Sequence, residues 1–355
     1  MSGLKQLLSG PPFEQYDEGR FFRALTESLE RWKQNDLYRR KLERSEVDGP
    51  VTSWGDVHQL PTIGMREFKQ HPEELAIDEL NPDQALYSSG TTSESKSFAA
   101  RSTKTLEIHQ SNLASFSRAI IGDVDYAAAL GVPRGDLARL PADVSRRALF
   151  RYLLWLMEPH DASFFLRVSG NKEIEPEYDR LYEYLDQHSG KGVLKGSTSG
   201  IAAFCNYLEE QDASLDLGED GMVITGGGWK GQSEMTRDEL RTLIARQFGI
   251  QEENQLDFYS ATEFTFFTGS KPGDDNPSLK RVPAQAYCYI ADIETFRTQG
   301  VVEPVANGEE GLLVVVDPLN RSHPGVILTD DVMRKTGGEY GQDVRIDHMG
   351  RSTRI

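Results

Sequence analysis

The chain has 355 residues, 38% of them hydrophobic, and a mean hydropathy of -0.51, which is typical of a globular protein with a substantial core. Its 56 acidic and 39 basic residues give a net charge of -17, which disfavours nucleic acid or an anionic membrane as a partner. The sequence contains neither a long apolar stretch nor a signal peptide, so no membrane insertion is expected. It contains two cysteines, Cys205 and Cys288, which imply no disulfide framework and predict a cytoplasmic location.

The first part of the chain is predicted to be helical. Phe22, Leu25, Leu29 and Trp32 recur every three or four residues, which places them on one face of a helix over residues 20–43. Residues 48–84 are rich in Pro, Gly, Asp and Glu and are expected to connect short elements. Residues 1–84 are therefore predicted to form a helical region that packs on the main body.

Farther along, helix and strand patterns alternate, which predicts an α/β fold. Helices are expected over residues 103–121, 148–157, 175–187 and 201–210, and from a Thr236–Glu239 capping box to about residue 248. Strands are expected over residues 163–168, 192–195 and 255–260, and from Met222 to a triple glycine. Three further strands, over residues 287–291, 312–316 and 326–328, have no predicted helices between them, which indicates a mostly antiparallel part. Cys205 and Cys288 fall at apolar positions of a helix and a strand, so a packing role is expected for both.

A hydroxyl-rich segment, Tyr87-Ser-Ser-Gly-Thr-Thr-Ser-Glu-Ser-Lys-Ser97, lies between two short apolar stretches and is predicted to be a loop between strands. Its glycine lets the backbone approach an oxyanion, its hydroxyls can donate hydrogen bonds, and its lysine supplies a positive charge. The candidate phosphate-binding residues are Ser88, Ser89, Gly90, Thr91, Thr92 and Lys96. A Walker loop is excluded, because Ser95 stands where the second glycine would be. On composition alone, an ordinary Ser/Thr loop is an equal alternative.

Four further motifs follow the loop in order: Thr225-Gly-Gly-Gly228, Tyr259-Ser-Ala-Thr-Glu263, Thr329-Asp-Asp331 and Gly350-Arg351. The set and its order resemble the adenylate-forming superfamily, which includes acyl-CoA ligases, luciferases and adenylation domains. The resemblance implies the large N-terminal domain of that superfamily, in which mixed sheets pack with helices and a smaller antiparallel part is added. It also implies that the hydroxyl-rich loop holds the phosphates of ATP, with Lys96 in a catalytic role.

The resemblance assigns roles to the motifs around the adenine and the phosphates. Gly226, Gly227 and Gly228 are expected to lie along the adenine, and Tyr259 to stack near it. In a catalytic role, Thr262 is expected to contact the α-phosphate, and Glu263 to hold the Mg²⁺ that accompanies ATP.

The last two motifs are implied to contact the ribose. Asp331 is expected to accept hydrogen bonds from the ribose hydroxyls, and Arg351 to contact ribose or phosphate. Two positions depart from the superfamily pattern, because Ser260 and Asp330 stand where glycines are usual. The second departure leaves open which of the two aspartates contacts the ribose, and Asp331 is the one predicted here.

Within the superfamily, the chain resembles the LuxE-like acyl-protein synthetases of the bacterial fatty-acid reductase system. This resemblance implies activation of a carboxylic acid, a fatty acid in particular, as its acyl-adenylate. A protein thiol, on a reductase or an acyl carrier, then receives the acyl group. Trp229, Lys230 and Phe264 flank the nucleotide motifs and are candidates for binding the acid, although the two aromatic residues fit ordinary core positions equally well.

Two features depart from these relatives. LuxE-like enzymes transfer the acyl group to a cysteine near the C-terminus, but no cysteine follows Cys288. The small C-terminal domain of typical ligases is expected to be largely absent, since residues 85–350 match the core and residues 351–355 only the start of the hinge. Either the chain is a truncated or minimal form, or a partner completes the site. The alternative functions are an acyl-CoA, aryl-CoA or carrier-protein ligase, and a non-catalytic nucleotide-binding subunit.

Overall fold

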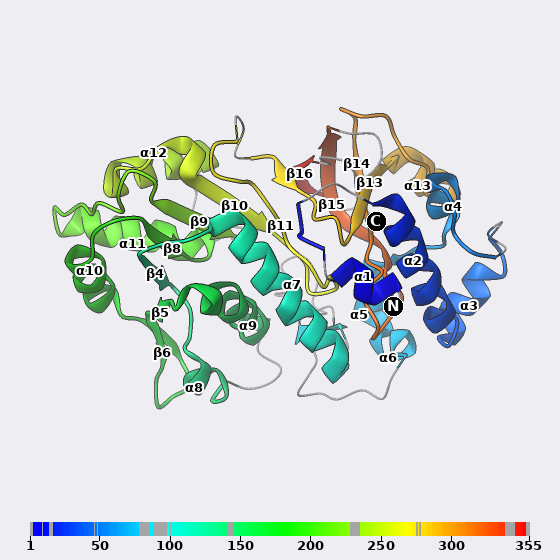
Figure 1. The fold of residues 1–355 in the computed structure, drawn as a ribbon, viewed down its shortest axis with the longest axis horizontal. Coiled ribbons are helices and arrows are strands. Elements are labelled where there is room, and N and C mark those ends of the chain that lie inside the picture. The colour runs from blue at the N-terminus through cyan, green and yellow to red at the C-terminus, as the bar shows by residue number, and fades with distance from the viewer. Residues whose placement is uncertain are drawn as a thin grey trace. The chain divides into compact units, whose positions relative to one another are not determined.

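The structure is a computed structural model that describes residues 3–8, 10–13, 17–45, 47, 49–77, 86–87, 98–99, 101–140, 145–227, 235–274, 276, 278–337 and 345–352. The chain forms two compact units, each built from separated segments (Figure 1). The first unit comprises Met1–Asn112, Ala261–Phe267 and Arg281–Ile355. The second comprises Leu113–Ser260 and Thr268–Lys280. The domain boundaries predicted from the motifs lie after residues 84 and 350. The division into two compact units does not test them, so they stay predictions.

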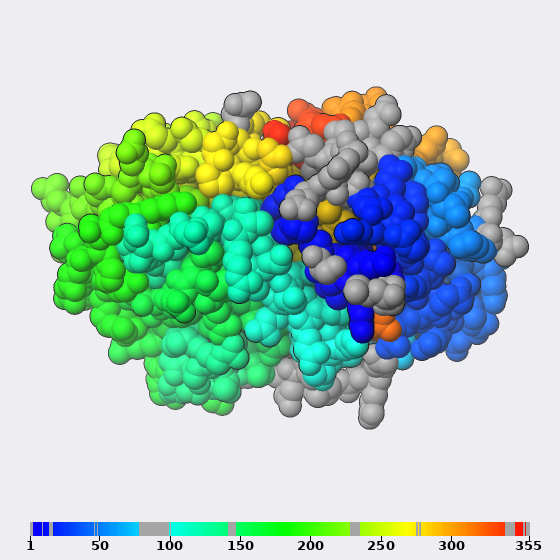
Figure 2. All heavy atoms as spheres, in the orientation of Figure 1, coloured from blue at the N-terminus to red at the C-terminus, as the bar shows by residue number. Residues whose placement is uncertain are grey.

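The first unit begins with a series of helices. Atoms of α1 and α2 are visible at its surface (dark blue in Figure 2). The helices are α1 (Gly3–Leu8), α2 (Glu18–Trp32), α3 (Asp36–Leu42), α4 (Trp54–Gln59), α5 (Met65–Gln70) and α6 (Pro72–Leu75). The single helix predicted over residues 20–43 is wrong, because the chain breaks between α2 and α3. Asn35 causes the break, since its side chain accepts a hydrogen bond from the backbone N–H of Tyr38 at 2.9 Å and caps α3.

An antiparallel sheet forms the other part of the first unit, as predicted. Its strands lie in the order β13 (Tyr287–Ala291), β14 (Glu310–Val316), β15 (Val326–Thr336) and β16 (Arg345–Arg351), and β1 (Ile63–Gly64) pairs with β15 in parallel. The expectation that no helix separates these strands is wrong, because α13 (Ile293–Gln299) lies between β13 and β14. This helix has no fully buried residue, so it leaves no apolar stripe in the sequence. The sequence features that indicate this helix are Asp292, which caps its start, and Gly300, whose positive φ of 69° ends the helix.

Two elements beside the predicted phosphate loop are confirmed. β2 (Leu86–Tyr87) and β3 (Phe98–Ala99) pair antiparallel, so the residues between them connect two neighbouring strands. The helix predicted over residues 103–121 is α7 (Thr103–Ile121), whose first ten residues belong to the first unit and whose remainder belongs to the second.

The second unit is an α/β fold built on a parallel sheet. Its strands are β4 (Tyr126–Ala129), β5 (Ser163–Phe164), β8 (Gly192–Lys195), β9 (Met222–Gly226), β10 (Gln255–Tyr259) and β11 (Thr268–Gly269), and β12 (Lys280–Arg281) follows at its boundary. The order across the sheet is β11-β10-β9-β8-β4-β5, and every pairing except β10 with β11 is parallel. β4 and β8 are buried along their whole length, as expected for strands covered on both faces.

Helices connect the parallel strands. They are α8 (Arg134–Leu137), α9 (Ser145–Met157), α10 (Tyr178–Gln187), α11 (Thr198–Glu210) and α12 (Arg237–Phe248), with 3₁₀ turns at η2 (Glu158–His160) and η3 (Glu252–Asn254). The capping box of Thr236 and Glu239 at the start of α12 is confirmed. Cys205 on α11 and Cys288 on β13 are both fully buried, which confirms their packing role. Within the part of the chain that the structure describes, no helix is long and apolar enough to cross a membrane.

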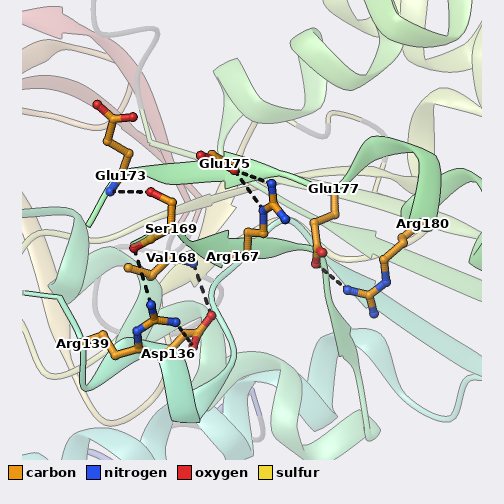
Figure 3. Close-up of polar contacts among 9 residues, drawn as sticks. All are labelled: Asp136, Arg139, Arg167, Val168, Ser169, Glu173, Glu175, Glu177 and Arg180. Atoms are coloured by element: carbon orange, nitrogen blue, oxygen red, sulfur yellow. Dashed lines mark hydrogen bonds and ion pairs between the residues drawn. The ribbon is translucent and has the colours of Figure 1, made fainter. Parts of the chain in front are cut away.

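Several predicted elements have different bounds in the structure: the helices predicted from residues 148 and 201 begin at Ser145 and Thr198, and the strand predicted over residues 326–328 extends to Thr336. The strand predicted over residues 163–168 is divided into β5 and β6 (Leu166–Val168), and β6 forms a hairpin with β7 (Ile174–Pro176). The helix predicted from residue 175 therefore begins only at Tyr178, because the residues before it pair with β6. Figure 3 shows the ion pair between Arg167 and Glu175 across this hairpin, at 2.6 Å. Both side chains are exposed, so the pair adds little stability, about 0–1 kcal/mol.

Candidate functional site

The carboxyl ends of the parallel strands in the second unit define a candidate binding edge. From β4 the chain continues to β5 on one side, whereas from β8, on the other side of β4, it continues outward to β9. The connections after β4 and β8 therefore run in opposite directions. Open α/β sheets bind ligands outside the carboxyl ends of strands at such a switch point.

The predicted adenine turn lies at this edge. Gly226 is the last residue of β9 and pairs with Phe258 of β10, and Gly227 follows with a φ of 79°, which favours glycine. A β-carbon on Gly226 would lie 3.0 Å from the backbone oxygen of Phe258, which is closer than side chains normally approach. Thr198, at the start of α11, donates its hydroxyl to the oxygen of Gly227 at 2.6 Å and fixes the turn. The absence of a side chain at Gly226 leaves bare backbone beside β10, as a turn against a flat ligand requires.

Tyr259 stands one strand farther along, as the last residue of β10. Its backbone oxygen accepts a hydrogen bond from the hydroxyl of Thr268 on β11 at 3.2 Å. Since β9 and β10 are parallel neighbours, Gly226 and Tyr259 both stand at the carboxyl edge of the same sheet. The structure thus brings these two predicted residues together within one unit.

A residue that sequence reasoning missed, Lys195, ends β8 at the same edge. It is 4% exposed, and its Nζ donates to the oxygen of Gly196 at 3.2 Å and lies 5.4 Å from the ring centre of Phe258. A β-carbon on Gly226 would lie 3.1 Å from this Nζ. Burial lowers the pKa of Lys195 to about 7, against the opposing effect of the Asp257 carboxylate. The sequence feature that could have identified Lys195 is a lysine in a short strand that is otherwise apolar and is buried along its whole length.

The Thr-Glu motif belongs to the first unit and is held by buried polar side chains. Arg101 is 2% exposed and donates to the backbone oxygens of Thr262 at 2.6 Å and Phe264 at 3.1 Å. Asn320 donates to the backbone oxygen of Glu263 at 3.1 Å, and the Glu263 residue is 1% exposed. The backbone oxygens of Thr262, Glu263 and Phe264 are therefore held by side chains distant in sequence, which fixes the backbone that carries the Thr262 and Glu263 side chains.

Two further buried groups complete this support. Asp317 accepts hydrogen bonds from the backbone N–H of Thr265 at 2.7 Å and from its hydroxyl. Burial raises the pKa of Asp317, and these hydrogen bonds together with the nearby charge of Arg101 oppose the rise. Nε2 of His323 lies 2.7 Å from a terminal nitrogen of Arg101. Burial, and to a smaller extent the charge of Arg101, lowers the pKa of His323 well below its usual range. The neutral imidazole then accepts from Arg101 through Nε2 and donates to the oxygen of Pro324 through Nδ1.

The side chains of the Thr-Glu motif differ in their surroundings. Among the described residues, the Thr262 hydroxyl is buried without a hydrogen-bond partner. Phe264, a predicted substrate residue, is 1% exposed and stacks on Phe266 at 5.5 Å between ring centres. Thr262 is thus a hydroxyl available to a ligand, whereas Phe264 has the surroundings of a core residue.

The predicted ribose residues are brought together on adjacent strands of the first unit. Asp331 of β15 and Arg351 of β16 are directly paired in the antiparallel ladder. The Asp331 side chain is mostly buried and lies 3.4 Å from Nε2 of His348. Its neighbour Asp330 points to the opposite face of the strand and forms an ion pair with Lys69 at 2.9 Å. Asp330 is therefore already engaged by a lysine.

The remaining predicted site residues lie outside the described part of the chain. They are Ser88, Ser89, Gly90, Thr91, Thr92 and Lys96 of the phosphate loop, and Gly228, Trp229 and Lys230 after the adenine turn.

Comparison with solved structures defines the class of fold. 2-Hydroxyisobutyryl-CoA ligase, in complex with 2-HIB-AMP and CoA, is similar with a TM-score of 0.64 at 16% identity, covering 94% of this chain and 74% of that one. ATP-bound MatB from Rhodopseudomonas palustris gives a TM-score of 0.50 at 16% identity over 75% of this chain and 47% of that one. A long-chain-fatty-acid-CoA ligase from Archaeoglobus fulgidus gives 0.51 at 14% identity over 78% and 53%. The fold is that of the adenylate-forming ligases, as predicted.

Sequence comparison narrows this class to one family. Residues 6–354 match the family described as acyl-protein synthetase, LuxE. The long-chain-fatty-acid–luciferin-component ligase of Vibrio harveyi is 26% identical over 324 residues, which are 88% of this chain and 79% of the relative. The protein of the same name from Aliivibrio fischeri is 28% identical over 189 residues, which are 52% of this chain and 46% of the relative. The chain belongs to the LuxE acyl-protein synthetase family, a family of ligases, which confirms the resemblance inferred from the motifs.

Proposed function

We propose that this protein uses ATP to activate a fatty acid as its acyl-adenylate and then passes the acyl group to a thiol of another protein. The observation that carries the proposal is the match of residues 6–354 to the acyl-protein synthetase family. The name of the Vibrio harveyi relative, which specifies a long-chain fatty acid, supports the substrate class. The ATP bound to MatB, which has a similar fold, supports the nucleotide.

The reaction consists of two displacements. In the first, an oxygen of the carboxylate forms a bond to the α-phosphorus of ATP, and the bond from that phosphorus to pyrophosphate breaks. In the second, a thiolate attacks the acyl carbon and AMP leaves with the electron pair. The first step spreads negative charge over phosphate oxygens, so the protein contributes mainly positioning and electrostatic stabilisation.

Thr262 and Glu263 fit the α-phosphate and its metal ion. The Thr262 hydroxyl is buried and without a partner among the described residues, so a phosphate oxygen would satisfy it. Glu263 presents a carboxylate in a buried position next to it, and carboxylate oxygens are ligands that Mg²⁺ prefers. Mg²⁺ bound with ATP would neutralise charge on the phosphates. Arg101 and Asn320 contribute by holding the backbone of this segment in one conformation.

The other motif residues are proposed to bind the nucleotide and the acid. Gly226 and Gly227, followed by Gly228, and Tyr259 would bind the adenine, and Asp331 with Arg351 the ribose. The hydroxyl-rich loop, from Ser88 to Lys96, would bind the phosphates. Trp229, Lys230 and Phe264 are retained as candidates for contact with the acid.

The burial of both cysteines supports a separate acyl acceptor. Cys205 and Cys288 are each 0% exposed. Burial raises the pKa of Cys205 to about 12 and that of Cys288 further still, so neither thiol forms the thiolate that attacks an acyl-adenylate near neutral pH. A cysteine of a reductase or the thiol of an acyl carrier is the proposed acceptor, and the cytoplasm, which keeps thiols reduced, is the proposed location.

The test is exchange of labelled pyrophosphate into ATP in the presence of Mg²⁺ and one acid at a time, from acetate, octanoate, decanoate, hexadecanoate and benzoate. Exchange with the fatty acids is expected. Glu263→Gln should lower the exchange rate by about 100-fold or more, as removal of one electrostatic group at a charged transition state does. Glu219→Gln, at an exposed position of the second unit, is the matched control and should exchange normally. ATP binding without exchange for any acid would contradict the proposal and favour a nucleotide-binding subunit.

A further inference from the structure

Lys195 is a buried amine whose charged form is not paired with a carboxylate among the residues that the structure describes. Its Nζ meets one backbone oxygen, that of Gly196, and one aromatic face, that of Phe258. Among the residues that the structure describes, no carboxylate lies within 4.0 Å of it. Asp257 is near enough to influence it but forms its own ion pair with Lys280 at 2.9 Å. A buried ammonium is costly unless it is paired, so without a counter-ion the pKa of Lys195 falls to about 7, and a ligand of opposite charge would favour the charged form.

The place of Lys195 in the fold favours a ligand as the counter-ion. Lys195 is the last residue of β8, and β4 and β8 are the two strands that flank the switch point of the sheet. The connection after each strand leads away from the other, so the carboxyl ends of this pair form the part of the sheet where ligands bind. The ammonium lies beside Gly226, because a β-carbon placed on that glycine would be 3.1 Å from Nζ. The side chain therefore points toward the glycine turn after β9.

The chemistry around Nζ favours a carboxylate over a polyphosphate. One ammonium neutralises one negative charge, and the ring of Phe258 lies beside it, with the ring centre 5.4 Å from Nζ. A triphosphate carries several charges and requires several donors. A single cation beside an aromatic ring suits a ligand with one charged end and a hydrocarbon remainder.

We propose that Lys195 binds the carboxylate of the acid substrate, and that the acid lies with this end beside the Gly226–Gly227 turn. The assignment rests on the proposed function, since it takes a fatty acid as the substrate class. It adds a substrate-binding residue and an orientation, with the carboxylate at the carboxyl edge of β8 and β9. The ion pair between Lys195 and the substrate carboxylate would also supply the counter-ion that the buried ammonium otherwise lacks.

The experiment compares the wild type, Lys195→Met and the control Lys191→Met in pyrophosphate exchange with decanoate. Lys191 lies directly before β8 and four residues from Lys195, an even spacing that places both side chains on the same face of a strand. Unlike Lys195, it is partly exposed. Lys195→Met should raise the KM for decanoate by about 10- to 100-fold, since a charge-assisted bond is lost. The KM for ATP should stay within about 2-fold, and Lys191→Met should leave both constants unchanged within the same margin. An unchanged KM for decanoate would overturn the proposal, and a raised KM for ATP alone would assign Lys195 to phosphate instead.

A binding measurement separates lost charge from lost packing and does not depend on activity. Thermal unfolding is followed with decanoate or with decan-1-ol, which has the same chain but no charge. The wild type should be stabilised more by decanoate than by the alcohol, and Lys195→Met should lose this preference while keeping the response to the alcohol. Lys195→Gln, which is one atom shorter and keeps an uncharged donor group, replaces Lys195→Met if that variant does not fold. Equal loss of both responses would make Lys195 a packing residue, and a wild type without preference for decanoate would refute the proposal. A wild type that binds decanoate selectively but supports no exchange would instead contradict the proposed function.

Discussion

Replacing Arg101 by methionine should loosen the segment that carries Thr262 and Glu263. Arg101 donates to the backbone oxygens of Thr262 and Phe264, and its other terminal nitrogen lies 2.7 Å from His323. Hydrogen bonds from charged donors contribute about 1.5–3 kcal/mol each, and part of that is offset because methionine removes a buried charge. The Phe264 oxygen is buried and would lose the Arg101 donor, whereas the bond to the Thr262 oxygen is only partly buried. The net destabilisation of this segment is expected to be about 2–4 kcal/mol.

Hydrogen exchange measured by mass spectrometry is the appropriate assay, because a chain with two compact units need not unfold in one step. Peptides covering residues 261–267 should exchange about 30- to 900-fold faster in Arg101→Met than in the wild type, which is the stability loss converted to a ratio of rates. Arg101→Lys, which keeps a charge but cannot serve both oxygens from one planar group, should fall between the two. The control is Arg40→Met, at an exposed position of α3. Protection of residues 261–267 within about 3-fold of the wild type in Arg101→Met would refute the reasoning.

Two further outcomes are expected. Lys195→Met should raise the free energy of unfolding by at most roughly 5 kcal/mol below pH 7, because lowering the pKa of a lysine from 10.5 to about 7 costs the folded state that amount. The gain should shrink as the pH rises from 7 to 10.5, since the folded wild type loses its proton before the unfolded chain does, and urea unfolding at pH 6 and pH 9 measures the difference. The Cys205→Ala, Cys288→Ala double variant should keep pyrophosphate exchange, and the native wild type should resist a thiol reagent that labels it rapidly in urea. Rapid labelling of either cysteine in the native protein would contradict their assignment to the core.

The elements that the sequence predicted well are those in which one local pattern decides the structure. α7 has the predicted bounds because its apolar residues recur at helical spacing along its length. α12 begins where Thr236 and Glu239 cap it, and β8 is a short apolar run between glycines and polar residues. In each case burial and capping favour the same structure, so the pattern is unambiguous.

Elements without such a pattern were missed. α13 buries no residue completely, so only its Asp292 cap and its terminal glycine indicate it. The break between α2 and α3 depends on one hydrogen bond of Asn35, which interrupts an apolar periodicity that would otherwise continue. The support of the Thr-Glu motif could not be predicted, because Arg101 and Asn320 lie more than fifty residues away from it in sequence, and only the fold brings them to Thr262 and Glu263.

The discontinuous composition of the first unit has a consequence for biosynthesis. Trp32 is completely buried, and its indole nitrogen donates to Asn320, which the ribosome adds 288 residues later. At about 5–20 residues per second, the apolar face of α2 waits roughly 15–60 s for this partner. The second unit, which ends at Lys280, is synthesised completely within that interval. The unit that begins first is therefore completed last.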